Sequence, residues 1–458
     1  MKKETKKWAE RELGTAELGD KRLTKRLVEV AESFSDSPDA SIPKATINWN
    51  NAKGAYRFFD NPKVTGEKIL KAHGESSEKR VDEYTESSVI LAIQDTSEVN
   101  YSSHLSCELG HGGQVDTNVL FLHPTLICTE EGVPLGLIQQ QIWKRTELAG
   151  ELRREKPIEE KESYKWLKSF KATAEFQQNH PEKHVVNICD REGDIYDLLY
   201  LAKQAKEKGK IDLLVRSSSN RRIKEGQNLH AFLENQISQG CYQLEIARNG
   251  KRTARKIKMG VRFCEVSICP PKYSSHSKEV EGLKVWAIEA IEENPTASIP
   301  TCWKLITTYP VSTLDEAKKV IDWYASRWII EEYFKVLKSG CKIEDRQLQT
   351  FDRLEACLAL DAIIAWRILF LLYAGRQMPE LPASILFEES ECKALYSYTH
   401  QTPNPPPNPL TLQDMTSYLA KLGGFLGRKG DGLPGAIVLW RGAWRLPDIT
   451  ATWKIFNP

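Results

Sequence analysis

At Ser88-Val-Ile-Leu-Ala-Ile-Gln-Asp95 the sequence changes from helical periodicity to an apolar run rich in β-branched side chains, which predicts a β-strand. Two further runs of the same kind follow at residues 119–128 and 134–143. Three successive strands joined by short connections suggest an antiparallel meander.

Beyond residue 143 helical and strand patterns alternate. The expected elements are a charged helix near 159–174, a strand at 184–190, a helix from 194 to about 206 and a strand at 211–216. Antiparallel strands followed by such an alternation predict an α/β fold with a mixed sheet.

The first 72 residues have a helical pattern. Asp20 is a candidate N-cap for a helix in which Leu23, Leu27 and Val30 recur at helical spacing. Arg22 and Arg26 lie four residues apart on one side of this helix. That side is either a solvated face or a phosphate-contacting face.

Between residues 217 and about 300 the helical signal fades, which predicts an all-β insertion with strands near 240–246, 261–268 and 285–291. A further strand is expected at 302–308. Ser312-Thr-Leu-Asp-Glu316 is typical of a helix start, and the helix is expected to continue to about Gly340. More helices are expected near 353–373 and 411–422, with the proline-rich segment 402–409 as a stiff linker between them.

The composition indicates a folded protein: of 458 residues, 28% are charged and 41% hydrophobic. The net charge of +2 does not by itself indicate a nucleic-acid partner. Positive charge is concentrated at residues 216–262, a segment that contains eleven basic residues and only three acidic ones. A patch of this kind could hold an anionic partner.

The ten cysteines lack the spacing of a zinc site, so reduced structural thiols are expected. We found no run of about 18 apolar residues and no secretory leader pattern. These features favour a cytoplasmic protein without a membrane partner.

Two carboxylates follow apolar strands. Asp95 ends one predicted strand and Asp190 ends another, and an acid at the exit of a strand in an α/β sheet lies at the rim where ligands bind. Asp190 has an alternative reading, because it could simply cap the helical segment that follows it.

A third carboxylate lies on the helix expected at 312–340. With about 100° per residue, Tyr324, Arg327, Glu331 and Lys338 fall at about 0°, 300°, 340° and 320°, so they share one face, with Trp328 and Lys335 beside them. The alternative is that Arg327 and Glu331 form an ordinary i,i+4 ion pair on a solvated helix. Aromatic side chains within the charged face favour a contact surface.

Three carboxylates at one sheet rim suit a pair of divalent ions acting on a phosphodiester. Hard oxygen ligands favour Mg²⁺, for which Mn²⁺ can substitute.

The spacing of Tyr324, Arg327, Glu331 and Lys338 resembles the YREK signature of bacterial insertion-sequence transposases with a DDE site. Other motifs follow in the order of that family: Glu17-Leu-Gly-Asp-Lys-Arg22, Gly54-Ala-Tyr-Arg-Phe58, Gln94-Asp-Thr-Ser97, Glu160-Lys-Glu-Ser-Tyr-Lys-Trp166, Cys189-Asp-Arg-Glu192 and Leu422-Gly-Gly-Phe425. The resemblance therefore runs along nearly the whole chain.

The resemblance implies an RNase H-like catalytic domain at residues 73–375, interrupted by a β-rich insertion at about 217–300. It implies a helical DNA-binding domain at 1–72 and a helical dimerisation domain at 376–458. It also implies that the protein is a cut-and-paste transposase, which nicks transposon ends, forms and reopens hairpins and joins the ends to target DNA as a homodimer.

The resemblance also assigns roles to individual residues. It makes Asp95, Asp190 and Glu331 the catalytic triad that holds two Mg²⁺ ions. The residues implied to contact DNA are Tyr324, Arg327, Lys338 and Lys335 at phosphates, Trp303 and Trp328 at a flipped base, Arg216 from the catalytic domain, and Arg22, Arg26 and Arg57 from the N-terminal domain.

Two other functions share parts of this pattern. A metal-dependent nuclease of the same fold would need the triad without its aromatic and basic neighbours. A non-catalytic DNA-binding repressor would not need the triad.

Overall fold

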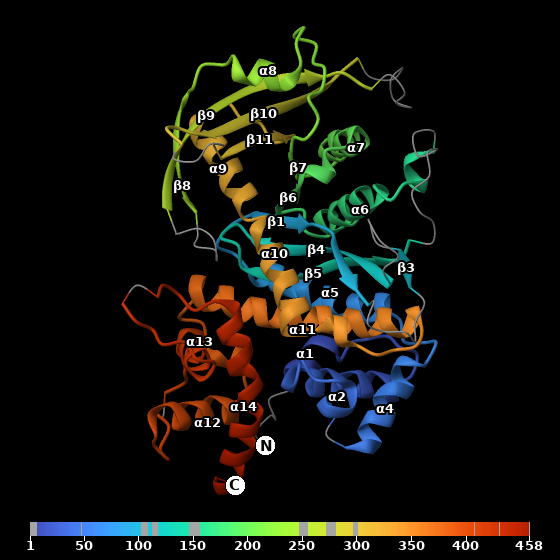
Figure 1. Ribbon diagram of the computed structural model, residues 1–458, viewed down its shortest axis with the longest axis vertical. Coiled ribbons are helices and arrows are strands. Elements are labelled where there is room, and N and C mark those ends of the chain that lie inside the picture. The colour runs from blue at the N-terminus through green and yellow to red at the C-terminus, as the bar shows by residue number, and fades with distance from the viewer. Residues whose placement is uncertain are drawn as a thin grey trace. The chain divides into compact units, whose positions relative to one another are not determined.

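The computed structural model describes residues 7–46, 48–101, 109–111, 118–145, 156–246, 255–271, 281–295, 301–406, 408–429 and 431–457 (Figure 1). The chain forms two compact units. The first comprises Met1–Thr85, Thr96–Gly150 and Ile329–Pro458, and the second comprises Glu86–Asp95 and Glu151–Trp328.

The second unit is built on a mixed β-sheet, as the sequence predicts. Its strands lie in the order β1 (Val89–Gln94), β6 (His184–Cys189), β7 (Ile211–Arg216), β11 (Cys302–Thr307), β10 (Leu283–Glu292), β9 (Arg255–Ile268) and β8 (Gly240–Ile246). The first three strands are mutually parallel, and the pairs from β7 to β8 are antiparallel. The strands of the insertion therefore continue the main sheet.

The insertion is not all-β as expected, because helix α8 (Leu229–Glu234) lies within it. The buried Leu229 and Leu233 of α8 belong to the same hydrophobic core as the strands of the insertion. A six-residue helix is too short to leave a clear periodic pattern in the sequence, so it was missed.

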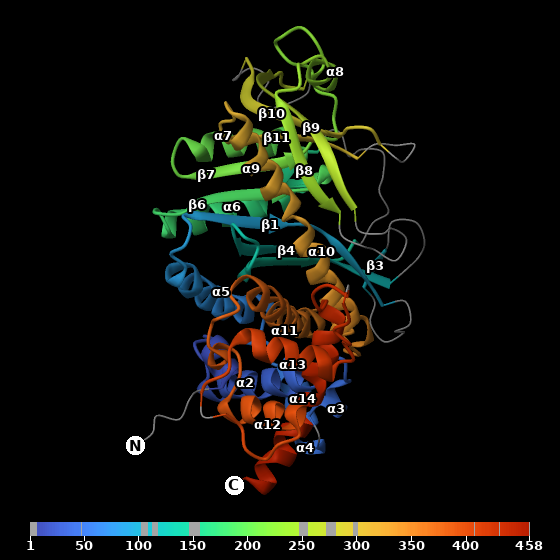
Figure 2. The same ribbon diagram turned by 90° about the vertical axis from the view of Figure 1, so that its left-hand side faces the viewer.

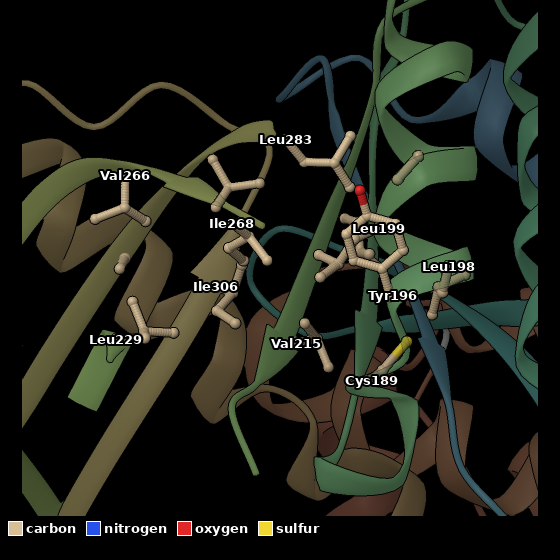
Figure 3. Close-up of a cluster of buried hydrophobic side chains, with 14 of the residues drawn as sticks. Cys189, Tyr196, Leu198, Leu199, Val215, Leu229, Val266, Ile268, Leu283 and Ile306 are labelled. Atoms are coloured by element: carbon tan, nitrogen blue, oxygen red, sulfur yellow. The ribbon is translucent and has the colours of Figure 1, made fainter. Parts of the chain in front are cut away.

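Helices cover both faces of this sheet. Helices α6 (Tyr164–Asn179) and α7 (Tyr196–Lys206) lie on one face and α9 (Leu314–Ala325) on the other, as Figures 1 and 2 show from two directions. Short 3-10 turns occupy Ile158–Glu160 and Arg191–Gly193. A core cluster includes Val215 of β7, Ile306 of β11 and Leu199 of α7 (Figure 3). This packing fixes the sheet that carries Asp95 and Asp190 at its rim.

The helix expected at 312–340 begins as predicted but is interrupted. Thr313 and Glu316 form a reciprocal capping box at the start of α9. The helix ends at Ala325, a turn occupies residues 326–327, and α10 follows at Trp328–Lys335. The Ser326 hydroxyl donates to the carbonyl of Asp322, a side-chain bond that competes with regular helix geometry.

A π-helix at Val336–Gly340 follows α10 directly. Because i to i+5 bonding widens the turn, Lys338 does not keep the angular position that a uniform α-helix would give it. The single polar face predicted for residues 324–338 is therefore wrong as a continuous feature.

The first unit combines antiparallel strands with helices. Strands β4 (Asn118–Thr129) and β5 (Pro134–Trp143) form an antiparallel hairpin, and β2 (Ser97–Asn100) and β3 (Gly110–His111) also pair with β4. Helices α5 (Gly66–Glu83) and α11 (Phe351–Gln377) pack against each other and against β5.

The remaining helices of this unit belong to the N-terminal and C-terminal parts of the chain. The N-terminal helices are α1 (Trp8–Leu13), α2 (Lys21–Asp36), α3 (Ile42–Ala45) and α4 (Trp49–Phe59), and the C-terminal ones are α12 (Glu389–His400), α13 (Leu412–Leu422) and α14 (Ala436–Phe456), with 3-10 turns at Ile343–Asp345 and Ala383–Ile385. Asp20 caps α2 as predicted, since its side chain accepts from the Arg22 amide. The sequence pattern did not predict α12 and α14 individually, although the resemblance implied a helical domain at 376–458. The expected domain boundary after residue 72 lies within α5.

Helix α11 is the core helix of the first unit. By length and composition it is apolar enough to cross a membrane, but 89% of its most apolar window is buried within the protein. The charged residues Asp361 and Arg367 interrupt this window in the sequence, which is why it was not recognised as a long apolar run.

A buried ion pair ties α11 to the N-terminal helices. Arg346 donates from Nε to Asp361 Oδ2 at 2.8 Å and from Nη2 to Asp361 Oδ1 at 2.6 Å. The same guanidinium donates to the carbonyls of Ala40 and Pro38, in the segment after α2. Its charge and its donors are thus satisfied in the interior, as a buried arginine requires.

Asp361→Ala should lower the free energy of unfolding by about 3–5 kcal/mol, because it leaves the Arg346 guanidinium buried without its counter-ion. Asp60→Ala is the matched control, since it removes an aspartate paired with Arg353 at the surface and should cost about 0–1 kcal/mol. Denaturant unfolding followed by circular dichroism measures both. Equal losses for the two variants would contradict this role of the buried pair.

Candidate active site and nucleic-acid interface

The parallel pairing of β1 with β6 places Asp95 beside Asp190. Ile93 is the register partner of Ile188, and each aspartate follows its isoleucine by two residues. Adjacent strands are separated by about 4.8 Å, so two side chains at equivalent exits lie next to each other. The structure thus brings together two of the three predicted carboxylates.

A buried polar network lies directly behind these two aspartates, and the sequence analysis missed it. Gln94 Nε2 donates to Asn187 Oδ1 at 2.6 Å and to Cys189 Sγ at 3.2 Å. Asn187 in turn donates to Thr173 Oγ1 on α6 at 2.9 Å. Polar residues within otherwise apolar strands were the available signal. The network locks the register of β1 and β6 and therefore the separation of the two acids.

Asp190 caps the 3-10 turn that follows it, so the alternative role as a cap, which the sequence left open, is confirmed. Its Oδ1 accepts from the Glu192 amide at 2.8 Å. Burial raises the pKa of the Asp190 carboxyl above its usual value, and the cap and the charge of Arg327 oppose that shift. A raised pKa means that the ionised form is held at some cost in free energy, a pattern that is common at functional sites.

Asp95 is held by Arg327. The Arg327 Nη1 atom donates to Asp95 Oδ2 at 2.9 Å, and both side chains are largely buried, with 15% and 17% exposed. Arg327 lies in the turn between α9 and α10, outside the regular part of either helix. The two residues are 232 positions apart in the chain.

Tyr324 lies in the interior and contributes to a second cluster in this unit. It is only 4% exposed, and its ring packs edge-on against Trp303 with 5.4 Å between the centroids. Burial raises the pKa of its hydroxyl, which also shares a hydrogen bond with Arg216. Arg216 donates in addition to the carbonyl of Cys302. The expected exposure of Tyr324 is thus wrong, because α9 packs this side against the sheet.

The remaining predicted residues of this region lie on α10 and the π-helix. Glu331 is half-buried and its neighbour Glu332 accepts from the Tyr373 hydroxyl at 2.8 Å. Trp328 is 58% exposed and Lys335 is exposed. Lys338 donates from Nζ to the carbonyl of Glu98.

The three N-terminal arginines lie on α2 and α4. Arg22 is paired with Asp20, its cap, and Arg26 with Glu29 at 2.9 Å. The Arg26 guanidinium lies over Gly54 of α4, where a Cβ atom would approach its Cζ to 3.2 Å. Arg57 is exposed on α4.

Helix α4 presents a mixed aromatic and basic face that the sequence analysis did not single out. Trp49 is 74% exposed, and Lys53, Tyr56 and Arg57 are also exposed. Their spacing from Trp49, by four, seven and eight residues, puts them on one side of the helix. Exposed aromatic side chains beside cations form the kind of surface that contacts nucleic acid.

The positive charge predicted at 216–262 is partly neutralised by ion pairs, so it is smaller than the residue count indicated. Arg221 pairs with Asp194, Lys224 with Glu281, Lys258 with Glu293 and Arg262 with Glu289. These acidic partners come from outside the counted segment, so a count along the chain could not include them. Arg248, Lys251 and Arg252 lie outside the described residues.

The donor set fits a hard divalent cation. Asp95 and Asp190 offer carboxylate oxygens from adjacent strands, and the nearby Cys189 thiol is fully buried within the polar network behind them. Oxygen donors without accessible sulfur or imidazole favour Mg²⁺ or Mn²⁺ over zinc.

Comparison with known proteins gives three family matches. They are "Transposase DNA-binding" over residues 5–64, "Transposase DDE domain" over 157–366 and "Transposase Tn5 dimerisation domain" over 363–451. Asp190 and Glu331 lie within the range of the DDE domain, and Asp95 precedes it.

A solved structure, a piggyBac transposase synaptic complex with hairpin DNA, matches with 11% sequence identity and a TM-score of 0.34. The match covers 80% of this chain, which spans 62% of the length of that one. The three family matches occur in one chain and together extend over most of it. The protein belongs to the Tn5 family of DDE transposases.

Proposed function

We propose that this protein catalyses cut-and-paste DNA transposition, with Asp95, Asp190 and Glu331 as the carboxylates that hold its divalent metal ions. The observation that carries the proposal is the aligned exit of β1 and β6, which puts two carboxylates side by side in a chain with a transposase DDE domain. Mg²⁺ is the expected ion and Mn²⁺ a substitute.

Chain connectivity supports Glu331 as the third carboxylate. Arg327, which is paired with Asp95, immediately precedes α10, and Glu331 lies in the first turn of α10, four residues further along the chain. Glu331 also lies within the range of the transposase DDE domain.

Bound divalent ions would stabilise charge on the attacking and leaving oxygens of a phosphodiester. The protein's own groups hold and orient the site: the Gln94 and Asn187 amides fix the strand exits, and the Glu192 amide orients the Asp190 carboxylate. Such preorganised groups need little rearrangement when the reaction begins.

In this proposal duplex DNA is the substrate and a second copy of the chain is the partner. The α4 face, with Arg22 and Arg26 beside it, would grip the transposon end, while Lys335 and Lys338 would contact phosphates near the active site. The C-terminal helices would form the homodimer of the synaptic complex, as the dimerisation-domain match indicates.

We further propose that nicking is followed by hairpin formation, hairpin opening and strand transfer into target DNA. In this proposal the exposed Trp328 would stack on a flipped base, and Trp303 would support it from the cluster with Tyr324 and Arg216. The cytoplasm is the proposed compartment, because the cysteines among the described residues are free thiols.

Replacing any one carboxylate should abolish cleavage of a duplex that carries the terminal repeats flanking the gene. Asp95→Ala, Asp190→Ala and Glu331→Ala should each lower the cleavage rate by at least about a thousandfold, since each removes a metal ligand. Gel analysis of nicked and hairpin products in Mg²⁺ measures this loss.

Neighbouring carboxylates provide the controls. Glu332→Gln and Glu192→Gln remove acids next to Glu331 and Asp190 in the sequence and should keep cleavage within a few-fold of wild type. If the triad variants still cut, the site assignment is wrong. If wild type itself only binds the repeats without cutting them, a repressor function replaces this proposal.

Asp190→Asn should raise the melting temperature by a few degrees at pH 7 in the absence of divalent ions. Because burial raises the pKa of this carboxyl in the folded state, the ionised form costs stability at every pH above that pKa. The cost disappears as the pH falls below the pKa of the unfolded state, so the gain should vanish near pH 3.

Differential scanning fluorimetry across pH measures this dependence. Adding Mg²⁺ should then stabilise wild type more than Asp190→Asn, because only the wild type keeps both strand-exit carboxylates. A variant that melts below wild type at pH 7 would contradict the argument.

Trp328→Ala should slow hairpin formation about tenfold while changing the first nick less than threefold, because stacking on an extruded base contributes about 1–3 kcal/mol. Trp328→Phe should recover part of the loss, since it keeps an aromatic face. Time courses that resolve nicked from hairpin DNA give both rates for each variant. Equal slowing of the two steps would exclude a stacking role for Trp328.

A further inference from the structure

The geometry points to a second role for Arg327. We propose that Arg327 is an internal counter-ion that hinders Asp95 from binding a divalent ion until a DNA phosphate draws the guanidinium away. DNA and metal ions would then bind this site cooperatively. The inference rests on the proposed function, because it takes Asp95 as a metal ligand.

The guanidinium and a metal ion would compete for the same carboxylate. Arg327 Nη1 lies 2.9 Å from Asp95 Oδ2, within a pair whose side chains are both mostly removed from solvent. A divalent ion bound at Asp95 would lie a few ångströms from this fixed positive charge. Repulsion between such charges is strong where solvent screening is weak, so the two cations exclude each other.

Without a metal ion, the site needs another cation. The exits of β1 and β6 hold Asp95 and Asp190 on adjacent strands, where their negative charges repel each other. Arg327 acts on both, through its ion pair with Asp95 and through its charge near Asp190. Arg327 therefore offsets the negative charge of these carboxylates in the free protein, as a bound metal ion would in the metal-bound protein.

Arg327 lies in the turn at residues 326–327, between α9 and α10, so rotation of its side chain would leave the regular helix hydrogen bonds in place. The neighbouring Trp328 is 58% exposed, so the turn faces a surface that DNA can reach.

A DNA phosphate is the partner that would release it. Guanidinium groups bind phosphate with two parallel hydrogen bonds, and this geometry matches the one they form with carboxylates. Exchange of Asp95 for a phosphate would therefore keep Arg327 paired with an anion and expose the Asp95 carboxylate. Because coupling is reciprocal, bound metal ions would equally strengthen the hold on DNA.

Binding of Mn²⁺ to the DNA-free, full-length protein tests the proposal by electron paramagnetic resonance of the free ion. Arg327→Gln should bind Mn²⁺ about tenfold more tightly than wild type, because it removes the charge and keeps a side chain of similar length. Arg327→Lys should stay close to wild type. Lys318→Gln is the matched control, since it removes a positive charge on α9 in the same unit and should change the affinity less than twofold.

A second arm uses wild-type protein and a duplex that ends at the transposon terminus, so that no scissile bond remains. This duplex should tighten Mn²⁺ binding about tenfold in wild type and have little effect in Arg327→Gln. The wild-type measurement does not depend on the folding of any variant. Equal Mn²⁺ affinity with and without DNA, or an Arg327→Gln affinity no higher than wild type, overturns the proposal.

Two results separate this inference from the proposed function. If the triad variants lose cleavage while Arg327→Gln binds Mn²⁺ no more tightly, the transposase assignment stands and the counter-ion role fails. If the tighter binding in Arg327→Gln persists after Asp95→Asn is added, the ion is bound elsewhere. Both the counter-ion role and Asp95 as a metal ligand then fail.

Discussion

The parallel pairing of β1 with β6 is the constraint on which the proposed chemistry depends. One register step would move Asp95 away from Asp190 and turn its side chain to the opposite face of the sheet. The buried amides of Gln94 and Asn187 make such a slip costly, because a shifted strand would leave them without partners. A structural hydrogen-bond network thus sets the geometry of the two aspartates that we propose as metal ligands.

The break between α9 and α10 has comparable importance. A continuous helix would have kept Tyr324, Arg327 and Glu331 on one exposed stripe. The turn instead lets Tyr324 pack into the interior against Trp303, while Arg327 reaches Asp95 from a position outside regular helix. This interruption therefore gives neighbouring residues different surroundings: Tyr324 is packed in the interior, and Arg327 is ion-paired with Asp95.

The sequence predictions were correct where interactions between residues close in the sequence decide the structure, and they failed where distant segments decide it. The caps at Asp20 and Thr313 and the strands at 184–189 and 211–216 were predicted correctly, because capping and alternation act over a few residues. The sequence pattern missed helices α12 and α14, although the resemblance implied a helical domain there, because α14 contains Pro447 and an apolar composition without clear periodicity. The insertion was expected to be all-β, but it contains α8, and its strands extend the main sheet through the pairing of β11 with β7, two segments far apart in the sequence.

Local pattern and family motifs were enough to identify the mixed α/β plan, the two strand-exit aspartates and the transposase relationship. Only the folded chain revealed that Asp95 and Asp190 share a register, that Arg327 pairs with Asp95 across 232 residues, and that acidic residues from other segments neutralise much of the insertion's charge. The reason is physical: propensity and periodicity depend on neighbours in the chain, whereas register, burial and ion pairing depend on which distant segments packing brings together.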